Sequence, residues 1–300
     1  MTLEEIIYSV LIGSRALTSA LTSYNGKPAV FYGSAPDDKA DGWDGRTQFP
    51  RIDYTADYVS NPERKTSGVL AVNIMCTEDG VLPEEIEPLV RNLLCGVFLT
   101  PSGGIPHSLA WARSEAYDRR REDGDGIVTG ISVLFDLYAF PAQVTTDPDP
   151  VLAMNRFAEV ALPDAEIIGG RKPTAEVFVP TPERPAIYFR LESLQTERET
   201  NTVAWLDGVV AGHVFAGGEE TVWIKRLADR LAEAGEVEML DTSPMFMRTV
   251  RADNTLDALS AGQLRLSVRF GILRRPGYHH PLMRPYGNTK PLFNAEATQS

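Results

Sequence analysis

Apolar and polar residues alternate along several stretches of the chain, and this pattern predicts strands with one buried face. Residues 69–75 read Val-Leu-Ala-Val-Asn-Ile-Met, and residues 264–270 read Leu-Arg-Leu-Ser-Val-Arg-Phe. Successive side chains of a strand point to opposite faces of the sheet, so alternation places one face in a core and the other in water. We therefore expect mostly antiparallel sheets with one solvated face.

Two other segments repeat their apolar residues at the spacing of a helix. Positions i, i+3, i+4, i+7 and i+8 are apolar in both, which forms one stripe along a helical surface. The stripes consist of Ile86, Leu89, Val90, Leu93 and Leu94 in one segment and of Ile224, Leu227, Ala228, Leu231 and Ala232 in the other. We predict helices over residues 83–95 and 219–234, each with one buried face.

The two halves of the chain resemble each other. Aligning Pro141 with Pro276, an offset of 135 residues, also aligns the apolar positions of 131–135 with those of 266–270. Self-similarity at a fixed offset is the sequence signature of a repeated structural unit. We therefore interpret the chain as a tandem duplication.

Each half is expected to contain the same succession of elements. In the first half we predict a helix at about 3–21 and, around the helix at 83–95, strands at about 28–32, 50–59, 65–77, 97–99, 109–117 and 127–139. In the second half we predict a helix at about 150–161 and, around the helix at 219–234, strands at about 175–179, 185–194, 202–215, 236–240, 245–252 and 262–274. Residues 30–33 match 177–180 at a larger offset, which we attribute to a longer loop at 36–46 in the first half.

These elements predict an α+β fold, in which two tandem copies of a mostly antiparallel sheet packed with helices are followed by an extended C-terminal arm. Residues 145–150 read Thr-Thr-Asp-Pro-Asp-Pro, and such alternate prolines continue neither a strand nor a helix. We therefore place the first domain at residues 1–145 and the second at 150–276. Residues 277–300 have no periodicity and contain three further prolines, so we interpret them as the arm.

The composition is that of a folded protein, and the charge argues against wholesale nucleic-acid binding. Hydrophobic residues make up 43% of the 300 positions, and 41 acidic residues against 29 basic ones give a formal net charge of −12. A phosphate backbone selects an excess of Lys and Arg instead. No apolar run approaches 18 residues, and the N-terminus carries acids where a secretory signal carries bases, so we expect a cytosolic protein without a membrane span.

No set of residues in the sequence points to catalysis or to a bound metal. Cys76 and Cys95 are too few for a disulfide scaffold, and the four His lack the spacing of metal ligands. We interpret His213 as structural and the His279-His280 pair as a packing or inter-subunit element. We therefore expect no enzymatic activity, no cofactor and no metal. One alternative stays open, because two carboxylates brought together from distant parts of the chain would support hydrolysis.

Large side chains in polar loops are the candidate interface residues of the first half. Trp43 and Arg46 lie in the inserted loop, and both residue types commonly anchor interfaces. Trp43 either packs on its own domain or anchors such an interface. Arg119, Arg120 and Arg121 form a basic run within an acidic loop, which is either solvated or faces a DNA channel or a charged partner.

The arm contains large apolar residues that its proline content prevents from forming a core of their own. They are Tyr278, Leu282, Met283, Tyr286, Leu292 and Phe293. Such side chains gain burial only against another surface. We predict that the arm and the loop at 36–48 lie at contacts between subunits or with the next ring of an assembly.

Several of these features occur together in a known family. They are the run Leu-Glu-Glu-Ile-Ile at 3–7, the segments 30–36 and 48–54, the hairpin and helix that follow, and the closing strand Ile-Ser-Val-Leu-Phe at 131–135. In this order each half resembles the tail terminator or tail-completion (neck) proteins of tailed bacteriophages and related prophage particles.

The resemblance implies a structural virion protein of the tail and neck, assembled in the cytoplasm of the bacterial host. Such proteins form a ring that caps the tail tube, stops its polymerisation and offers the face to which the filled head docks. Members usually carry one such domain and form hexamers, so two domains imply either a hexamer or a trimer that mimics one. The implied partners are further copies of the chain, the tail tube protein and a head–tail connector or adaptor protein. DNA is implied only as the genome passing through the channel, and no membrane is involved.

Other assignments stay open at this point. The chain could be another phage neck or tail ring component, or a tandem-domain ring protein of a host shell or secretion apparatus. Neighbouring genes for capsid, portal and tube proteins would favour the phage assignment. A small-molecule hydrolase with a site between the halves is the enzymatic alternative, and a cleft with convergent carboxylates at the domain junction would favour it.

Overall fold

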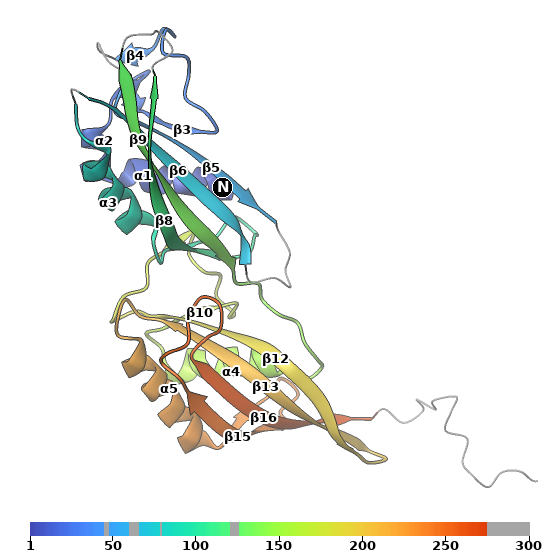
Figure 1. Cartoon of the computed structure of the whole chain (residues 1–300). Helices are drawn as coiled ribbons and strands as arrows, with labels where there is room; N and C mark the ends of the chain where they lie inside the picture. The colour runs from blue at the N-terminus through green and yellow to red at the C-terminus, as the bar shows by residue number, and fades with distance from the viewer. Residues whose placement is uncertain (45–47, 60–65, 79, 121–125, 275–300) are drawn as a thin grey trace, which may run out of the picture.

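The computed structural model describes residues 1–44, 48–59, 66–78, 80–120 and 126–274 (Figure 1). It has a mixed α+β fold with 22% helix and 43% strand, which confirms the predicted fold class. Two large sheets, each with helices packed on it, follow one another along the chain. We call these units the first and the second repeat. The predicted arm at 277–300 lies outside the described residues.

The first repeat extends from helix α1 (Leu3–Gly13) to strand β9 (Ile127–Ala139). The elements between them are α2 (Arg15–Ala20), β1 (Ser23–Tyr24), β2 (Lys27–Pro28), β3 (Val30–Tyr32), β4 (Trp43–Asp44), β5 (Arg51–Tyr58), β6 (Thr66–Thr77), α3 (Pro83–Leu94), β7 (Phe98–Leu99) and β8 (His107–Arg120). Strands β1, β2 and β4 form a separate three-stranded sheet. Part of the predicted loop at 36–46 is therefore a strand that pairs back on β1.

The second repeat extends from helix α4 (Pro150–Ala161) to strand β16 (Leu264–Leu273). The elements between them are β10 (Glu166–Ile168), β11 (Val177–Phe178), β12 (Ala186–Glu199), β13 (Val203–Phe215), α5 (Glu220–Ala234), β14 (Glu236–Glu238) and β15 (Pro244–Ala252). Asp149 caps α4, since its side chain accepts hydrogen bonds from the amides of Val151 and Leu152.

Both repeats arrange their strands in the same order. In the first sheet the strands of the first repeat run β3-β5-β6-β9-β8-β7, and in the second sheet those of the second repeat run β10-β12-β13-β16-β15-β14. In each sheet the first pair is parallel and the following pairs are antiparallel. A helix follows the third strand of each, α3 after β6 and α5 after β13. The shared order confirms that the chain contains two tandem copies of one fold.

Equivalent residues of the two repeats occupy equivalent places in the sheets. Ile131 of β9 pairs with Ile74 of β6, and Leu266 of β16 pairs with Val210 of β13. All four side chains are buried in the cores. The offset that aligns Ile131 with Leu266 in the sequence therefore aligns them in the structure as well.

Helices cover one face of each sheet, as Figure 1 shows. Buried apolar residues of α1 and α3 meet those of β6 and β9 in the core of the first repeat. Buried residues of α4 and α5 meet those of β13 and β16 in the core of the second. No helix in the described ranges combines the length and the apolar character needed to cross a membrane.

The N-terminal helical segment is two helices rather than the single helix predicted at 3–21. A capping box between Thr2 and Glu5 starts α1. Ser14 then adopts an extended conformation, which ends α1, and its side chain accepts a hydrogen bond from the amide of Leu17 at the start of α2. Serine competes for backbone amides and is favoured at caps. The spacing of apolar residues continues across Ser14, so it did not predict this break between the two helices.

Strand β11 does not join the sheet of its own repeat. Val177 and Phe178 pair antiparallel with Leu99 and Phe98 of β7, so β11 forms the edge of the first sheet. The prediction that 175–179 is the counterpart of 28–32 is therefore wrong. The counterpart of β3 is β10, which pairs parallel with β12 as β3 does with β5. The local match of sequence at these positions reflects a shared preference of Val and Phe for strands.

An aromatic cluster fills the junction between the repeats. The ring centroid of Phe140 lies 5.2 Å from those of Phe98 and Tyr188, and Phe98 lies 5.0 Å from Phe215. The hydroxyl of Tyr188 donates a hydrogen bond of 2.8 Å to the carbonyl of Pro141. Aromatic pairs at such distances stabilise a fold beyond the area they bury. Together with the pairing of β11 and β7, the cluster holds the two repeats to each other.

Candidate functional site

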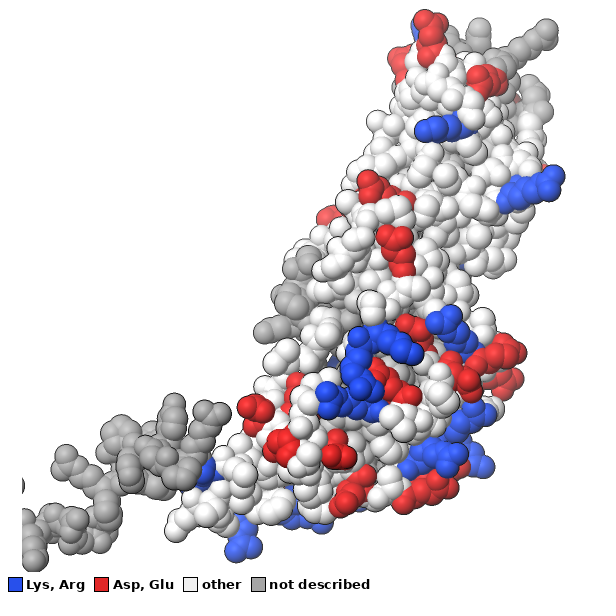
Figure 2. All heavy atoms as spheres, turned by 180° about the vertical axis from the view of Figure 1, so that it is seen from behind, with Lys and Arg blue, Asp and Glu red and all other residues white. Residues whose placement is uncertain are grey.

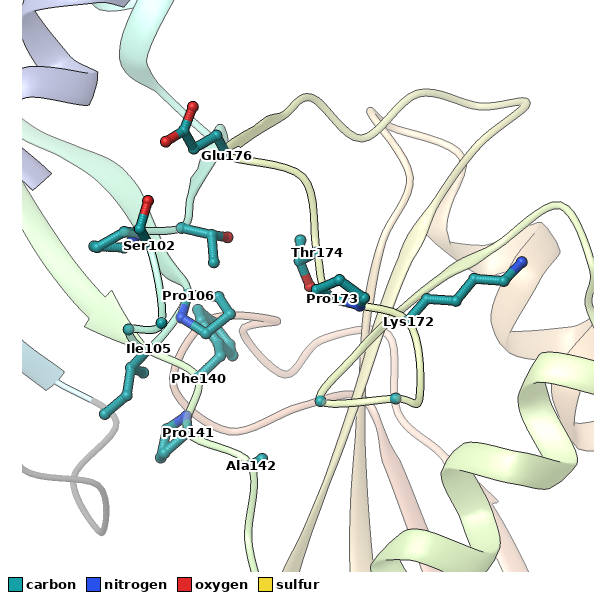
Figure 3. Close-up of a pocket in the computed structure, with 16 residues that line it drawn as sticks. Ser102, Ile105, Pro106, Phe140, Pro141, Ala142, Lys172, Pro173, Thr174 and Glu176 are labelled. Atoms are coloured by element: carbon teal, nitrogen blue, oxygen red, sulfur yellow. The ribbon is translucent and has the colours of Figure 1, made fainter. Parts of the chain in front are cut away.

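A pocket of about 710 Å³ lies between the repeats (Figure 3). Residues 100–106 from the first repeat, residues 140–142 after β9, and residues between Gly169 and Glu176 from the second repeat line it. Most of these are proline, glycine or other residues without a reactive side chain, because the segments are the turns that connect elements at the junction. An enzyme with its site between the halves would bind its substrate in this pocket.

The lining of the junction pocket contains two charged residues, Lys172 and Glu176. Figure 3 shows the Lys172 side chain extending away from the residues across the pocket. The Glu176 carboxylate lies 3.6 Å from the amino group of Met1. Hydrolysis by paired carboxylates needs two of them on either side of a substrate. The described residues of the lining supply one, so the convergent carboxylates that would favour a hydrolase do not occur among them.

The described residues offer few groups for nucleophilic or metal chemistry. Within the ranges that the structure describes, no cluster of three or more His, Cys, Asp or Glu could hold a metal ion. Cys76 is buried, and burial raises the pKa of its thiol to about 12. Because the thiolate is the reactive form, this shift keeps Cys76 unreactive. Burial also lowers the pKa of His107, at the start of β8.

His213 is buried in β13 and uses both ring nitrogens. Its Nδ1 donates to the carbonyl of Ala258 at 2.6 Å, and its Nε2 accepts from Nε of Arg190 at 3.3 Å. The ring lies 5.5 Å from that of Tyr188 at the junction. A ring that donates from one nitrogen and accepts at the other is a neutral imidazole. His213 therefore has a structural role in packing. The predicted pair His279-His280 lies outside the described residues.

Trp43 packs on its own repeat. Its ring lies 4.9 Å from Tyr24 and 5.8 Å from Phe31, and its Nε1 donates to the carbonyl of Asp37 at 3.1 Å. The guanidinium of Arg51 lies 5.6 Å from the ring centroid. Of the two placements that the sequence leaves open, this is the packed one. The residue is half-buried, so part of the ring remains at the surface.

A buried ion pair that no pattern in the sequence predicts holds the segment that carries Trp43. Nη1 of Arg51 lies 2.5 Å from Oδ1 of Asp38, with side chains 5% and 9% exposed. The Arg51 guanidinium also lies 4.5 Å from the ring of Phe49. Arginine is almost never buried unless it is paired. No periodicity indicates such a pairing between a loop residue and the first residue of a strand.

Arg119 and Arg120 lie exposed at the end of β8. Burial raises the pKa of nearby Asp53, against the lowering effects of a hydrogen bond from Asn73 and of the charges of Arg51 and Arg119. In Figure 1 this end of β8 and strand β4 lie at the end of the first repeat that is remote from the junction. The structure thus places Trp43 and the two arginines at the same end of the molecule. The other candidates lie outside the described residues: Arg46, Arg121, Tyr278, Leu282, Met283, Tyr286, Leu292 and Phe293.

The second sheet carries a charged network that was not among the candidates. Arg190 and Arg265 lie 2.8 and 2.7 Å from the carboxylate of Glu192, and Arg269 lies 3.8 Å from that of Asp207. Figure 2 shows basic and acidic side chains close together over the second repeat and few over the first. The alternation of arginine with buried apolar residues along β16 was the signal, since it predicts a solvated face.

Two strands leave long stretches of edge backbone without a partner strand among the described residues. Strand β8 pairs with β7 only at its first two residues, and β12 pairs with β10 only at its first three. Beyond these points β8 has a bulge after Trp111, and β12 has bulges after Leu191 and Thr196. Bulges limit uncontrolled pairing of edge strands. An open edge of this kind can still accept a strand of a suitable partner.

No protein-family model matches the sequence, and no curated protein matches it. Within the described residues, the features that stand out are the fused junction, the open edges of β8 and β12, and the end of the first repeat that carries Trp43, Arg119 and Arg120. All three are features of surfaces and contacts.

Proposed function

We propose that this chain is a structural virion protein of a tailed bacteriophage, a ring component that caps the tail tube, ends its polymerisation and joins the tail to the head. In this proposal residues 1–145 and 150–276 are two tail-terminator-like domains, and residues 277–300 are an arm. The protein is assembled in the bacterial cytoplasm and acts in the neck of the virion. Its partners are further copies of itself, the tail tube protein and a connector or adaptor protein.

The observation that carries the proposal is the repetition of one strand order across a fused junction. Closed rings are built from contacts that repeat around an axis. A chain that supplies two similar units, held together by the pairing of Phe178 with Phe98, supplies two successive positions of such a ring. Three chains then supply six positions, which matches the sixfold ring that the resemblance implies. A hexamer with the second repeat on its rim is the other arrangement.

The open edges of β8 and β12 support an assembly role. β-augmentation joins an edge strand to a strand of a partner through main-chain hydrogen bonds. The Leu191 amide of β12 donates to the Gln143 side chain of the connecting segment, and beyond this point β12, like β8 beyond Ser108, has no partner strand on its open edge among the described residues. The bulges in each strand restrict which partner strands fit.

The enzymatic alternative receives less support from the structure. The junction pocket would be the site of a hydrolase between the halves, and its lining offers the single carboxylate of Glu176. A ring protein of a host shell or secretion apparatus shares every structural feature of the phage proposal. The genes that neighbour this one distinguish the two, since a phage neck protein is encoded beside capsid, portal and tube proteins.

Imaging tests the proposal directly. The purified chain, alone and mixed with tail tube protein, is examined by negative-stain electron microscopy, and its mass is measured by analytical ultracentrifugation. We expect rings with a central channel that contain three or six copies and that sit at the ends of tubes. Adding the chain during tube polymerisation should shorten the tubes. A protein that stays monomeric under both conditions and leaves tube length unchanged would refute the proposal.

A further inference from the structure

A groove of about 550 Å³ lies at the edge of the first sheet, between the first two turns of α1 and the end of β3. Helix α1 contributes Glu4, Glu5 and Tyr8, and the strands contribute Tyr32 from β3 and Tyr54 from β5. The groove is separate from the junction pocket, and one of its lining residues, Phe31, also packs against Trp43. None of the features used for the proposed function lies in it.

The groove presents aromatic rings that are already held in place. Tyr32 is 56% exposed, and its ring centroid lies 5.5 Å from that of Tyr54. Tyr54 is buried and fixed, because its hydroxyl donates a hydrogen bond of 2.7 Å to the carbonyl of Glu4. An exposed tyrosine supported by a fixed one is a rigid apolar surface with little conformational entropy left to lose on binding.

The groove is also acidic. Among the described residues that line it, the only charged ones are Glu4 and Glu5. Glu5 accepts a hydrogen bond from the amide of Thr2 at 2.9 Å, and the Glu4 carboxylate is hydrogen-bonded to Tyr58. Within the described part of the chain, no Lys or Arg forms an ion pair with either carboxylate. Thr2 and Glu5 already satisfy the free amides at the helix N-terminus. The negative charge of the two carboxylates therefore makes the groove attractive to cations.

The sequence after Arg274 has the complementary chemistry. Residues 275–300 contain four prolines, at 276, 281, 285 and 291, and the basic residues Arg275, Arg284 and Lys290 against a single acid, Glu296. The chain as a whole carries a net charge of −12, so this segment is basic in an acidic protein. Proline-rich segments dock on aromatic grooves because their backbone is already restricted. All three basic residues stand directly before prolines, in Arg275-Pro276, Arg284-Pro285 and Lys290-Pro291.

The length and the starting point of this segment favour the groove of another copy. Strand β16 ends at the side of the second repeat that faces away from the junction, whereas β3 lies in the first repeat (Figure 1). Twenty-six extended residues span at most about 90 Å. In a ring of alternating repeats the second repeat of one chain adjoins the first repeat of the next, so the neighbour's groove lies within reach. The chain's own groove lies beyond the entire second repeat and the junction.

We infer that the groove between α1 and β3 binds residues 281–291 of a neighbouring copy, with prolines against Tyr32 and Tyr8 and with Arg284 or Lys290 beside Glu4 and Glu5. This inference rests on the proposed function, because it needs copies arranged side by side. It assigns the arm a receiving site, and each copy then straps the next.

Peptide binding tests the recognition. A fluorescent peptide of residues 279–294 is titrated with the intact chain, and anisotropy gives the Kd. We expect saturable binding that weakens at least tenfold in Tyr32→Ala, several-fold in Glu4→Gln, and at least tenfold with a peptide in which Arg284 and Lys290 are replaced by Glu.

Matched controls are Val160→Ala, which removes an apolar side chain that is 77% exposed on α4, and Glu84→Gln on α3. Equal binding by Tyr32→Ala and the intact chain would overturn the inference, as would no binding at all. Circular dichroism checks that the variants are folded.

Isotope mixing identifies which copy is bound. Equal amounts of ¹⁴N and ¹⁵N chain are mixed, and carbodiimide joins Lys290 to a carboxylate that it contacts. We expect cross-links from Lys290 to Glu4 or Glu5 in pairs of mixed isotope, which arise only between copies. Cross-links confined to same-isotope pairs would show that the segment docks on its own chain and would overturn the assignment to a neighbour. Tyr32→Ala could lose peptide binding and still form rings as well as the intact chain. That result would leave the proposed function standing and would show that ring formation does not need the contact between the arm and the groove.

Discussion

Phe178 of the second repeat pairs with Phe98 of the first, across the edge of the first sheet. Both side chains are buried in one cluster that also contains Phe140 and Tyr188. The junction is therefore part of a sheet and part of a core at the same time. A flexible linker would let the repeats move independently, whereas this junction fixes them in one relation.

Replacing Phe178 by Ala should loosen the junction. Truncation of a buried Phe costs about 3–5 kcal/mol, and Phe178 is 4% exposed. We expect a loss of this order in urea unfolding and a larger maximum dimension in small-angle scattering. The control is Val177→Ala at the adjacent residue, which is 39% exposed and should cost less than about 1 kcal/mol. Equal losses for the two variants would show that the cluster does not hold the junction.

Replacing Arg51 by Met should destabilise the first repeat. The change leaves the nearly buried carboxylate of Asp38 without its partner, and breaking a buried ion pair in this way costs about 3–5 kcal/mol. The fluorescence of Trp43 should change as well, because Arg51 lies over its ring. The control is Arg113→Met, whose exposed pair with Glu115 is worth about 0–1 kcal/mol. Similar losses for both variants would contradict the importance of burial here.

Replacing Gly130 by Ala should also destabilise the first repeat. A Cβ at this position would lie 2.4 Å from the ring of Tyr117 and 2.7 Å from the carbonyl of Ile74. Overpacking of this kind costs about 1–3 kcal/mol. Gly13, in the last turn of α1, has no atom within 4 Å of the same addition, so Gly13→Ala should leave stability unchanged or raise it by up to about 1 kcal/mol. Unfolding midpoints measure both, and a neutral Gly130→Ala would contradict the close contact.

Acid should destabilise the fold partly through His107. Burial lowers the pKa of His107 in the folded state below its ordinary value of 6.5. The unfolded chain therefore binds a proton there at a higher pH than the folded chain does, and stability falls as the pH drops through about 6.5. The free energy of unfolding, measured from pH 8 to pH 5, should decline less steeply in His107→Gln than in the intact chain. Parallel curves would show that His107 titrates alike in both states.

A charge added at the open edge of β8 should weaken assembly. Ala112 lies at the bulge of this strand and is exposed, and charged residues on an edge strand oppose pairing with another chain. We expect fewer rings for Ala112→Glu in electron micrographs and a shift toward monomer in sedimentation. The control is Val160→Glu, which adds the same charge on the exposed face of α4. Unchanged assembly of Ala112→Glu would place the contact between subunits elsewhere.

The strands, the helices and the duplication follow from periodicity, because they are decided by which side chains are buried. Ile131 and Leu266 illustrate this, since both alternate with polar residues and both lie in a core. Periodicity could not predict features that depend on one specific hydrogen bond or one specific strand pairing. Ser14 interrupts a helix through one hydrogen bond to Leu17, and Phe178 leaves its own repeat for a partner distant in sequence.

The sequence indicated which residue types form contacts, but it predicted only partly where these residues lie in the fold. An isolated Trp in a polar loop indicates a large apolar side chain in need of cover, and Trp43 finds that cover on Tyr24 and Phe31. The groove formed by Tyr8, Tyr32 and Tyr54 was invisible, because its three rings come from a helix and two strands that only the fold brings together.

The strand exchange at the junction has a consequence for synthesis on the ribosome. The chain emerges from its N-terminus, so β7 to β9 are available well before Phe178 has been made. Until then the edge of β7 and the ring of Phe98 lack their cover, and the first repeat is a nascent intermediate with an exposed aromatic edge. Translation speed between Ala139 and Phe178 thus sets how long that edge is open to other chains, and a pause in this interval would favour misassembly of polysomal neighbours.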